Sequence, residues 1–246
     1  MTAATSAPKE ISKVVSSPQE ALQGLCSGMR LMSGGFGLCG IPENSIHAIG
    51  KMHVTNLEVV SNNIGNSGRG LVEILVKDKI KKAYCSYVGG NPDFEKRLLA
   101  EEIDVELIPQ GTFSERIRAG GLGIRAFYTP TGYGTLIAEG KEVKHFDKPC
   151  ILETALTADY AIIKAEKGDP YGNLWFKETA RNFSPLMAMA ASTTVVEVEE
   201  LVGLGDIPPE DVHLPGLFVQ HIYQGQNYAN DIEFRKISDE KNEDKS

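Results

Sequence analysis

Short apolar runs along this chain alternate with longer segments in which apolar residues recur at helical spacing. Runs of the first kind are typical of strands buried in a parallel sheet, and segments of the second kind are typical of helices that cover it. The pattern predicts strands over residues 30–33, 57–61, 83–88, 105–108, 160–164, 194–198 and 217–223. It predicts helices over 17–25, from 42, over 71–76, from 91, over 112–121 and over 181–191. This alternation favours an α/β fold with an open, mostly parallel sheet flanked by helices.

The domain organisation predicted from this pattern is simple. No internal repeat or linker divides residues 12–228, so we expect one domain there, with a hairpin over residues 142–152. Residues 1–11 are rich in Ala, Ser and Thr but have no arginine, so we expect a disordered leader rather than a transit peptide. Residues 229–246 are polar and are expected to form a disordered tail.

Composition narrows the class of function. A chain of 246 residues with 41% hydrophobic residues can bury a sizeable core. The net charge of −8 argues against nucleic acid as the main partner, because phosphate contacts need clustered Lys and Arg. No apolar run approaches the ~18 residues of a membrane span. The four cysteines form no CxxC pair and have no histidine at metal-ligand spacing, which favours reduced thiols in a reducing compartment and predicts no metal site.

A glycine-rich run is the candidate for chemistry. It places four glycines within seven residues, after an apolar stretch and before Pro42, which suits a first helical turn. Such a strand, loop and helix arrangement can offer N–H groups to an anion or an oxyanion. The run does not fit a P-loop, because no Gly-Lys-Ser/Thr follows it. A tight strand-to-helix turn explains the same glycines, and the two interpretations are compatible.

The motifs along most of the chain resemble those of the family I CoA transferases, the 3-oxoacid CoA-transferases. The resemblance extends over about residues 12–228 and is carried, in order, by Gly-Gly-Phe-Gly-Leu-Cys-Gly-Ile-Pro-Glu (34–43), Val-Ser-Asn-Asn (60–63), Ser-Tyr-Val-Gly (86–89), Val-Glu-Leu-Ile-Pro-Gln-Gly-Thr (105–112), Arg-Ile-Arg-Ala-Gly-Gly (116–121), Thr-Pro-Thr-Gly-Tyr-Gly-Thr (129–135), Ala-Arg-Asn-Phe (180–183) and Pro-Gly-Leu-Phe-Val-Gln (215–220). We therefore expect a CoA-transferase fold, of the kind shared with sugar-phosphate isomerases.

The resemblance implies half of an enzyme. Members divide the active site between an α part, which this chain resembles, and a β part that carries a nucleophilic glutamate in a Ser-Glu-Asn-Gly motif, which is absent here. The chain ends where a fusion linker would begin, which favours a separate β subunit in an α2β2 heterotetramer. The implied reaction moves CoA from succinyl-CoA to a 3-oxo acid through a glutamyl-CoA thioester on that subunit. Acetoacetate is the expected acceptor and 3-oxoadipate the alternative.

The same resemblance assigns site residues. Gln110 matches a family glutamine that contacts the catalytic glutamate and its adducts, and a solvated amide at a strand end is the alternative. Asn62 and Asn63 match paired asparagines that contact CoA, with turn formation as the alternative. The remaining predicted CoA contacts are Gly34, Gly35, Phe36, Gly37, Leu38, Cys39 and Gly40.

The remaining expectations concern the substrates, the cellular location and two alternative functions. CoA thioesters are expected as substrates, with no tightly bound cofactor and no metal. A bacterial cytoplasm is the expected location, or the mitochondrial matrix if the source is eukaryotic. A sugar-phosphate isomerase and a non-catalytic ligand-sensing module remain as alternatives, since open α/β sheets with glycine loops serve both.

Overall fold

The computed structural model describes residues 12–66 and 68–230, and their main feature is an eight-stranded sheet. Seven strands follow the order β11-β10-β8-β1-β2-β3-β4, and all six pairings between them are parallel. The eighth strand, β9, pairs antiparallel with β8. Their bounds are Arg30–Ser33 (β1), Leu57–Val60 (β2), Ile80–Cys85 (β3), Asp104–Leu107 (β4), Ala158–Gly168 (β8), Leu174–Trp175 (β9), Ala191–Leu201 (β10) and His221–Gln224 (β11). The expectation of an open, mostly parallel sheet is confirmed.

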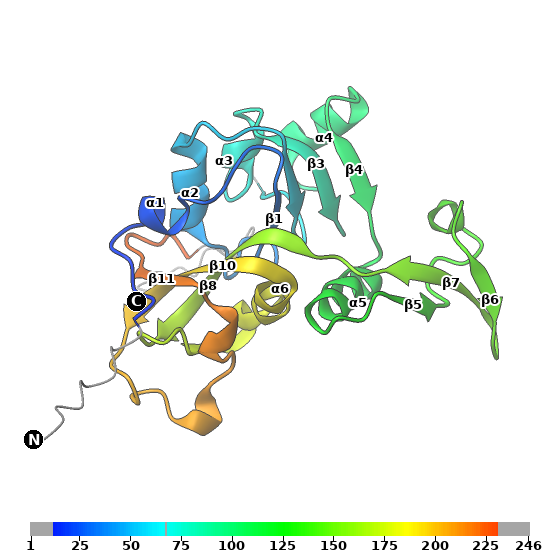
Figure 1. The fold of residues 1–246 in the computed structure, drawn as a ribbon. Coiled ribbons are helices and arrows are strands. Elements are labelled where there is room, and N and C mark those ends of the chain that lie inside the picture. Colours follow the sequence, from blue (N-terminus) through cyan, green and yellow to red (C-terminus); the bar gives the residue numbers. More distant parts are fainter. Residues whose placement is uncertain (1–11, 67, 231–246) are drawn as a thin grey trace, which may run out of the picture.

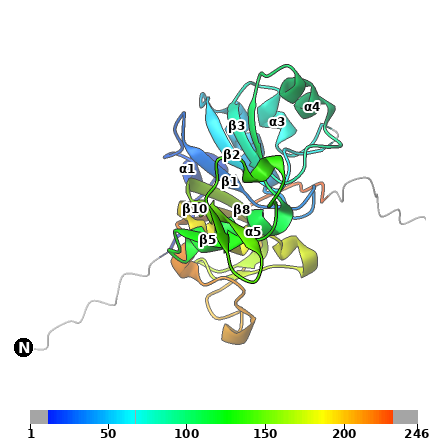
Figure 2. The ribbon, with the colours of Figure 1, turned by 90° about the vertical axis from the view of Figure 1, so that its right-hand side faces the viewer.

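Helices cover both faces of this sheet, as Figures 1 and 2 show. One face carries α1 (Pro18–Ala21), α2 (Glu43–Lys51), α3 (Val72–Leu75) and α4 (Pro92–Leu99). The other face carries α5 (Gln110–Gly121) and α6 (Ser184–Ala190). Neighbouring strand residues point to opposite faces, so Leu31 and Val59 join the core under α2 and α4, while Met32 and Val60 join the core under α5 and α6. Burial of both faces explains why the central strands read as continuous apolar runs.

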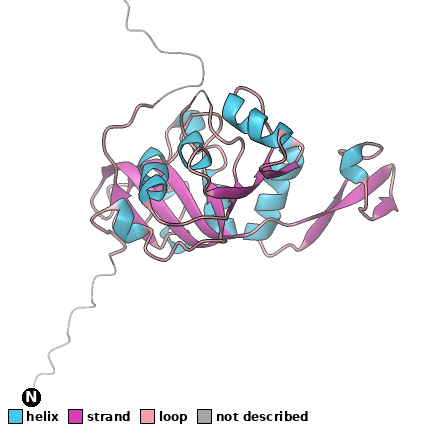
Figure 3. Cartoon of the chain, turned by 90° about the horizontal axis from the view of Figure 1, so that it is seen from above, coloured by secondary structure: helices cyan, strands magenta, loops and turns pink. Residues whose placement is uncertain are grey.

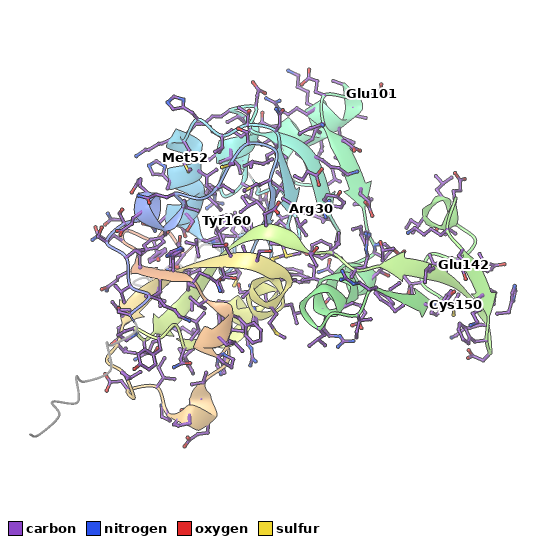
Figure 4. The ribbon with its side chains drawn as sticks, in the orientation of Figure 1. Arg30, Met52, Glu101, Glu142, Cys150 and Tyr160 are labelled. Atoms are coloured by element: carbon purple, nitrogen blue, oxygen red, sulfur yellow. The ribbon has the colours of Figure 1, made fainter. Side chains whose placement is uncertain are left out.

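A small antiparallel sheet projects from the body as an arm (Figures 1 and 3). It pairs β5 (Ala126–Thr129) and β6 (Val143–His145) with the central β7 (Pro149–Thr154). Figure 4 labels Glu142 and Cys150 on this arm. Arg116 of α5 ties its base to the body by donating to the Thr154 carbonyl over 2.7 Å. The expected hairpin over residues 142–152 is confirmed, and β5 extends it to three strands.

The expected bounds of several elements are wrong. The first helix ends at Ala21 rather than near residue 25, and the last strand begins at His221 rather than at residue 217. The third strand begins at Ile80 rather than residue 83, and α5 begins at Gln110 rather than at a capping box on Thr112. Pro109 is the N-cap residue of α5, and its carbonyl accepts from the Phe113 amide over 2.8 Å. Since that first turn is already closed, Thr112 lies inside the helix, where its hydroxyl has no hydrogen-bond partner among the described residues.

The ends of the chain differ in what the structure describes. The expected leader, and residues 231–246 of the expected tail, lie outside the described residues. The first two residues of that tail, Ala229 and Asn230, are bound to the body, because their amides donate to the Glu43 carboxylate over 3.0 and 3.1 Å. Within the described ranges, no helix has the length and apolar character needed to cross a bilayer.

Candidate functional site

The predicted site residues lie at one edge of the sheet. Strands β1 to β4 are adjacent and parallel, so the loops that follow them emerge at the same carboxyl edge. These loops contain, in sheet order, the glycine run 34–40, the asparagine pair 62–63, residues 86–90 and the Pro109–Gln110 turn. Open α/β sheets bind their ligands at this edge.

A hydrogen bond joins two of the predicted residues directly. The Gln110 side-chain amide donates to the Asn62 side-chain oxygen over 2.8 Å. Asn62 is buried at the end of β2, and Gln110 is exposed at the start of α5, so the bond crosses over the intervening β3. The Ser86 amide after β3 donates to the Asn62 carbonyl over 3.0 Å and fixes the loop between them. Two motifs that lie 48 residues apart in sequence therefore form one polar pair.

Asn63 behaves differently from its neighbour. Its side-chain amide donates to the Gly65 carbonyl over 3.3 Å, and the residue is buried. Asn91 closes the same loop from the α4 side by donating to the Ile64 carbonyl over 2.6 Å. The turn-forming interpretation describes Asn63, while Asn62 is the member of the pair that contacts Gln110.

The glycine run forms a tight turn. Phe36 and Cys39 exchange two backbone hydrogen bonds, each 3.0 Å long, around the two-residue tip Gly37-Leu38. The Phe36 side chain is 49% exposed, whereas Leu38 is only 2% exposed and packs into the protein. Phe36 can therefore contact a ligand at the edge, while the Leu38 side chain serves the core.

The helix after this turn is not an open anion site, and this part of the prediction is wrong. Pro42 is the N-cap of α2 and makes no side-chain cap. The fully buried Glu197 carboxylate instead accepts from the Asn44 and Ser45 amides over 3.2 and 2.8 Å, and from the Tyr223 hydroxyl over 2.9 Å. Burial raises the pKa of Glu197 despite these donors. Because the protein's own carboxylate occupies the helix N-terminus, an anion would have to bind to other N–H groups.

Asn182 has a role at the site that the sequence motif alone does not assign. Its side-chain oxygen accepts from the Gly35 amide over 3.0 Å, and its side-chain nitrogen donates to the Cys39 carbonyl over 3.1 Å. It thereby contacts the glycine run on both sides of the tip. The available signal is an asparagine directly before an apolar helix start, in the Ala-Arg-Asn-Phe motif.

Two cavities flank the glycine run, but neither encloses the polar pair. A cavity of about 810 Å³ lies over α2 and α3, and one of about 280 Å³ lies between the run and β8, with Leu38 lining both. Asn62, Asn63 and Gln110 line neither of these two cavities. In the part of the chain that the structure describes, no group of three His, Cys, Asp or Glu side chains is placed to hold a metal ion.

Sequence comparisons identify relatives over nearly the whole chain. A family model described as coenzyme A transferase matches residues 15–225. A protein of Helicobacter pylori strain J99, named as one of the subunits of succinyl-CoA:3-ketoacid coenzyme A transferase, is 54% identical over 91% of this chain and 97% of its own. A Bacillus subtilis protein with the same name, qualified as probable, is 50% identical over 92% of this chain and 95% of its own. The human mitochondrial succinyl-CoA:3-ketoacid coenzyme A transferase 2 is 43% identical over 96% of this chain, which covers 50% of the human protein.

Solved structures agree on the fold. An acyl-CoA transferase from Escherichia coli O157:H7 superposes with a TM-score of 0.82 over 93% of this chain and half of its own, at 20% identity. Glutaconate coenzyme A-transferase from Acidaminococcus fermentans superposes with a TM-score of 0.77 over 87% of this chain and 75% of its own, at 18% identity. At these identities the likeness establishes the architecture of the sheet and its helices.

Proposed function

Because the chain belongs to the coenzyme A transferase family, we propose that it is the α subunit of an enzyme that moves CoA from succinyl-CoA to a 3-oxo acid. Acetoacetate is the proposed acceptor. Support comes from bacterial relatives that are named as one subunit of such an enzyme and match over nearly their whole length at 50–54% identity. This evidence favours the transferase over an isomerase or a sensing module.

The observation that carries the proposal is the Gln110–Asn62 hydrogen bond at the carboxyl edge. The bond holds an exposed, neutral amide in a fixed place. An amide NH2 has two donor hydrogens, and one suffices for Asn62, so the other can point to an oxyanion. Such a donor stabilises charge that develops on a carbonyl oxygen during acyl transfer. Asn62 and the backbone of the glycine run would contact the CoA thioester on either side, and no tightly bound cofactor is required.

The nucleophile is proposed to come from a β subunit in an α2β2 assembly. Glu43 is the acid nearest the glycine run in sequence, but its two carboxylate oxygens accept from the Ala229 and Asn230 amides. The Ser-Glu-Asn-Gly motif is absent from the chain. The exposure of Gln110 and the human relative, of which this chain covers half, both favour a second part that completes the site.

The proposed reaction has two acyl exchanges on the partner's glutamate. Its carboxylate oxygen attacks the succinyl-CoA carbonyl carbon and the C–S bond breaks. CoA departs as the thiolate, and a mixed anhydride of succinate and the glutamate forms. The thiolate then attacks the glutamyl carbonyl carbon, which forms the glutamyl-CoA thioester and releases succinate. The carboxylate of acetoacetate attacks that thioester, which breaks the C–S bond, expels CoA thiolate and forms a second mixed anhydride. The thiolate then attacks the acetoacetyl carbonyl carbon, which releases acetoacetyl-CoA and restores the glutamate. Each addition creates an oxyanion, so the same donors serve all four steps.

The proposed setting is the bacterial cytoplasm, or the mitochondrial matrix in a eukaryote. Four free cysteines, two of them buried, are compatible with either reducing compartment.

The decisive test is co-expression with a β chain that carries Ser-Glu-Asn-Gly. The purified assembly should form acetoacetyl-CoA from succinyl-CoA and acetoacetate, with a higher kcat/KM for acetoacetate than for 3-oxoadipate. The single chain, assayed at the same concentration, should be inactive. Activity of the single chain would contradict the divided site, and preference for 3-oxoadipate would correct the acceptor.

A label would locate the intermediate. Borohydride reduces an acyl thioester, so adding acyl-CoA and then borohydride to the assembly should change the mass of one glutamate peptide. We expect that peptide in the partner chain, with the Glu43 peptide unmodified. A label on Glu43 would place the nucleophile in this chain instead.

A further inference from the structure

Asn182 connects two segments that are far apart in sequence. It lies between a short 3-10 helix, Glu178–Arg181, and the start of α6. Its side-chain oxygen accepts from Gly35 and its side-chain nitrogen donates to Cys39, over 3.0 and 3.1 Å, across 147 and 143 residues of chain. The oxygen of its side-chain amide thus contacts the glycine run before the tip, and the nitrogen contacts the run after the tip.

The backbone at this position is held in an unusual conformation. Asn182 has φ +24° and ψ −120°, a region that residues other than glycine rarely adopt. Its side-chain oxygen also accepts from the Phe183 amide over 2.7 Å, and its side-chain nitrogen also donates to the Thr179 carbonyl over 3.3 Å. These local bonds fix the amide plane before it meets the glycine run. A strained backbone that persists in this way is often linked to function.

The glycine run is packed directly against this segment. A side chain at Gly40, where φ is +69°, would place its Cβ 2.6 Å from the Ala180 carbonyl oxygen and 3.0 Å from the Asn182 side-chain nitrogen. A Cβ at Gly34 would lie 2.5 Å from the Ser184 hydroxyl oxygen. Glycine is therefore required at both ends of the run so that the 179–184 segment can approach it closely.

We propose that Asn182 is a positioning residue for the transfer reaction, which fixes the tip Gly37-Leu38 and the exposed Phe36 relative to Asn62 and Gln110. The inference rests on the proposed transferase function. The glycine run is anchored to the neighbouring strand end at its base, where the Ser61 hydroxyl donates to the Ser33 carbonyl over 3.0 Å. Asn182 supplies the anchor on the far side of the run. Without it, the tip would keep its own turn but lose its place at the edge.

Two substitutions separate the side-chain contacts from the backbone strain. Asn182→Gly removes both contacts with the run and relieves the positive φ, whereas Asn182→Ala removes the contacts and leaves the strain. Asn182→Asp keeps an acceptor for Gly35 but places an oxygen opposite the Cys39 carbonyl. If positioning matters, all three variants lose activity. If only the backbone conformation matters, Asn182→Gly keeps its activity.

The chain offers a matched control in Asn173. This asparagine also makes two side-chain contacts in a turn, since it donates to Asp169 over 2.8 Å and accepts from the Gly216 amide over 2.9 Å. Neither of its partners belongs to the glycine run. Asn173→Ala therefore tests the loss of an equivalent clamp elsewhere in the same molecule.

Steady-state kinetics of the assembly with its β chain gives the first readout. Wild-type turnover of succinyl-CoA and acetoacetate establishes the proposed function before any variant is measured. We expect Asn182→Gly to lower kcat about 10²-fold, the cost of a misplaced reacting group, while KM for succinyl-CoA changes less than about threefold. Asn173→Ala should keep kcat within about twofold. A kcat within twofold of wild type in Asn182→Gly would overturn the inference and leave the transferase assignment intact.

Alkylation of Cys39 gives a second readout that needs no activity. Cys39 is half-buried and its carbonyl is an Asn182 contact, while Cys26 is exposed elsewhere and serves as an internal reference. With the full chain and iodoacetamide, peptide mass spectrometry should show Cys39 modified several times faster in Asn182→Gly and Asn182→Asp than in wild type. The rate at Cys26 should be unchanged. Equal Cys39 rates in the variants and wild type would show that Asn182 does not hold the run, and would also overturn the inference.

Discussion

The two ends of strands β1 to β4 carry opposite kinds of side chain. At the amino end, the strand register places Arg30, Glu58, Lys82 and Asp104 side by side, so that charges alternate in sign across four strands. Arg30 donates to Glu58 over 2.7 Å, and Lys82 contacts Asp104 over 3.0 Å. At the carboxyl end, the same four strands lead into glycines, asparagines, a serine and a glutamine. One sheet thus presents a charged row at one end and a neutral row at the other.

The difference shows what each end is suited to do. Charges of alternating sign neutralise one another and leave little electrostatic field to attract a ligand. The charged row therefore contributes only modestly to the stability of the fold. Neutral amides and backbone N–H groups can donate to an oxyanion without a fixed charge that would trap an anionic product or pair with a catalytic carboxylate. Substitutions at the two ends of the strands test this division, and those at the carboxyl end should have the larger effects on the reaction.

Gln110→Ala should have the largest effect on the reaction. We expect kcat to fall about 10²–10³-fold, as is typical for loss of an oxyanion donor. The assay is succinyl-CoA turnover by the assembly with its β chain. Gln224→Ala is the matched control, because Gln224 is also exposed at a strand end and donates over 3.0 Å to a carbonyl, that of Glu199. A rise in KM with kcat unchanged would make Gln110 a binding residue.

The asparagine pair should separate into a functional and a structural member. Asn62→Ala removes the acceptor that orients Gln110, and a net hydrogen bond of about 1 kcal/mol predicts a fall in kcat of about fivefold. Asn63→Ala removes a bond within its own loop, so it should lower stability by about 1 kcal/mol and leave kcat nearly unchanged. Kinetics and urea unfolding of both variants distinguish the two roles. Equal losses of kcat would mean that Asn63 also contacts the substrate.

The fold was largely predictable from the sequence, and the residues show why. The strand at Arg30–Ser33 and the hairpin of the arm follow from local patterns of apolar residues and turns. The start of α5 does not, because the helix is capped at Pro109, three residues before the expected cap at Thr112. Local signals identify that a helix exists better than where it begins.

The site was predictable in part, because long-range contacts leave little local trace. The motifs identified Gln110 and Asn62, but not that the two amides bond to each other. They did not show that Glu197, which lies on β10, caps α2, nor that Asn182 holds the glycine run. In each case the partner lies in a distant segment that only the parallel sheet order brings to the same place.

Arg30→Met should have the smallest effect and tests the charged row. The substitution removes donation to Glu58 over 2.7 Å and to the Tyr84 hydroxyl over 3.0 Å, together with the contact of the guanidinium with the Tyr84 ring, but it keeps an unbranched apolar stem. The Arg30 and Glu58 side chains are 32% and 31% exposed, so water screens the pair. A loss of about 1 kcal/mol is therefore expected, which lowers Tm by about 2–4 °C.

Three observations would show that the charged row serves stability alone. The loss of stability in Arg30→Met should shrink at high salt, because salt screens partly exposed ion pairs. Lys82→Met should lose no more than Arg30→Met, because its partner Asp104 is 64% exposed. Both variants, assembled with the β chain, should keep wild-type kcat, since the row lies at the end of the strands opposite Gln110. A tenfold fall in kcat in either variant, at unchanged assembly, would mean that the charged end also acts on the reaction and that the division between the two ends is wrong.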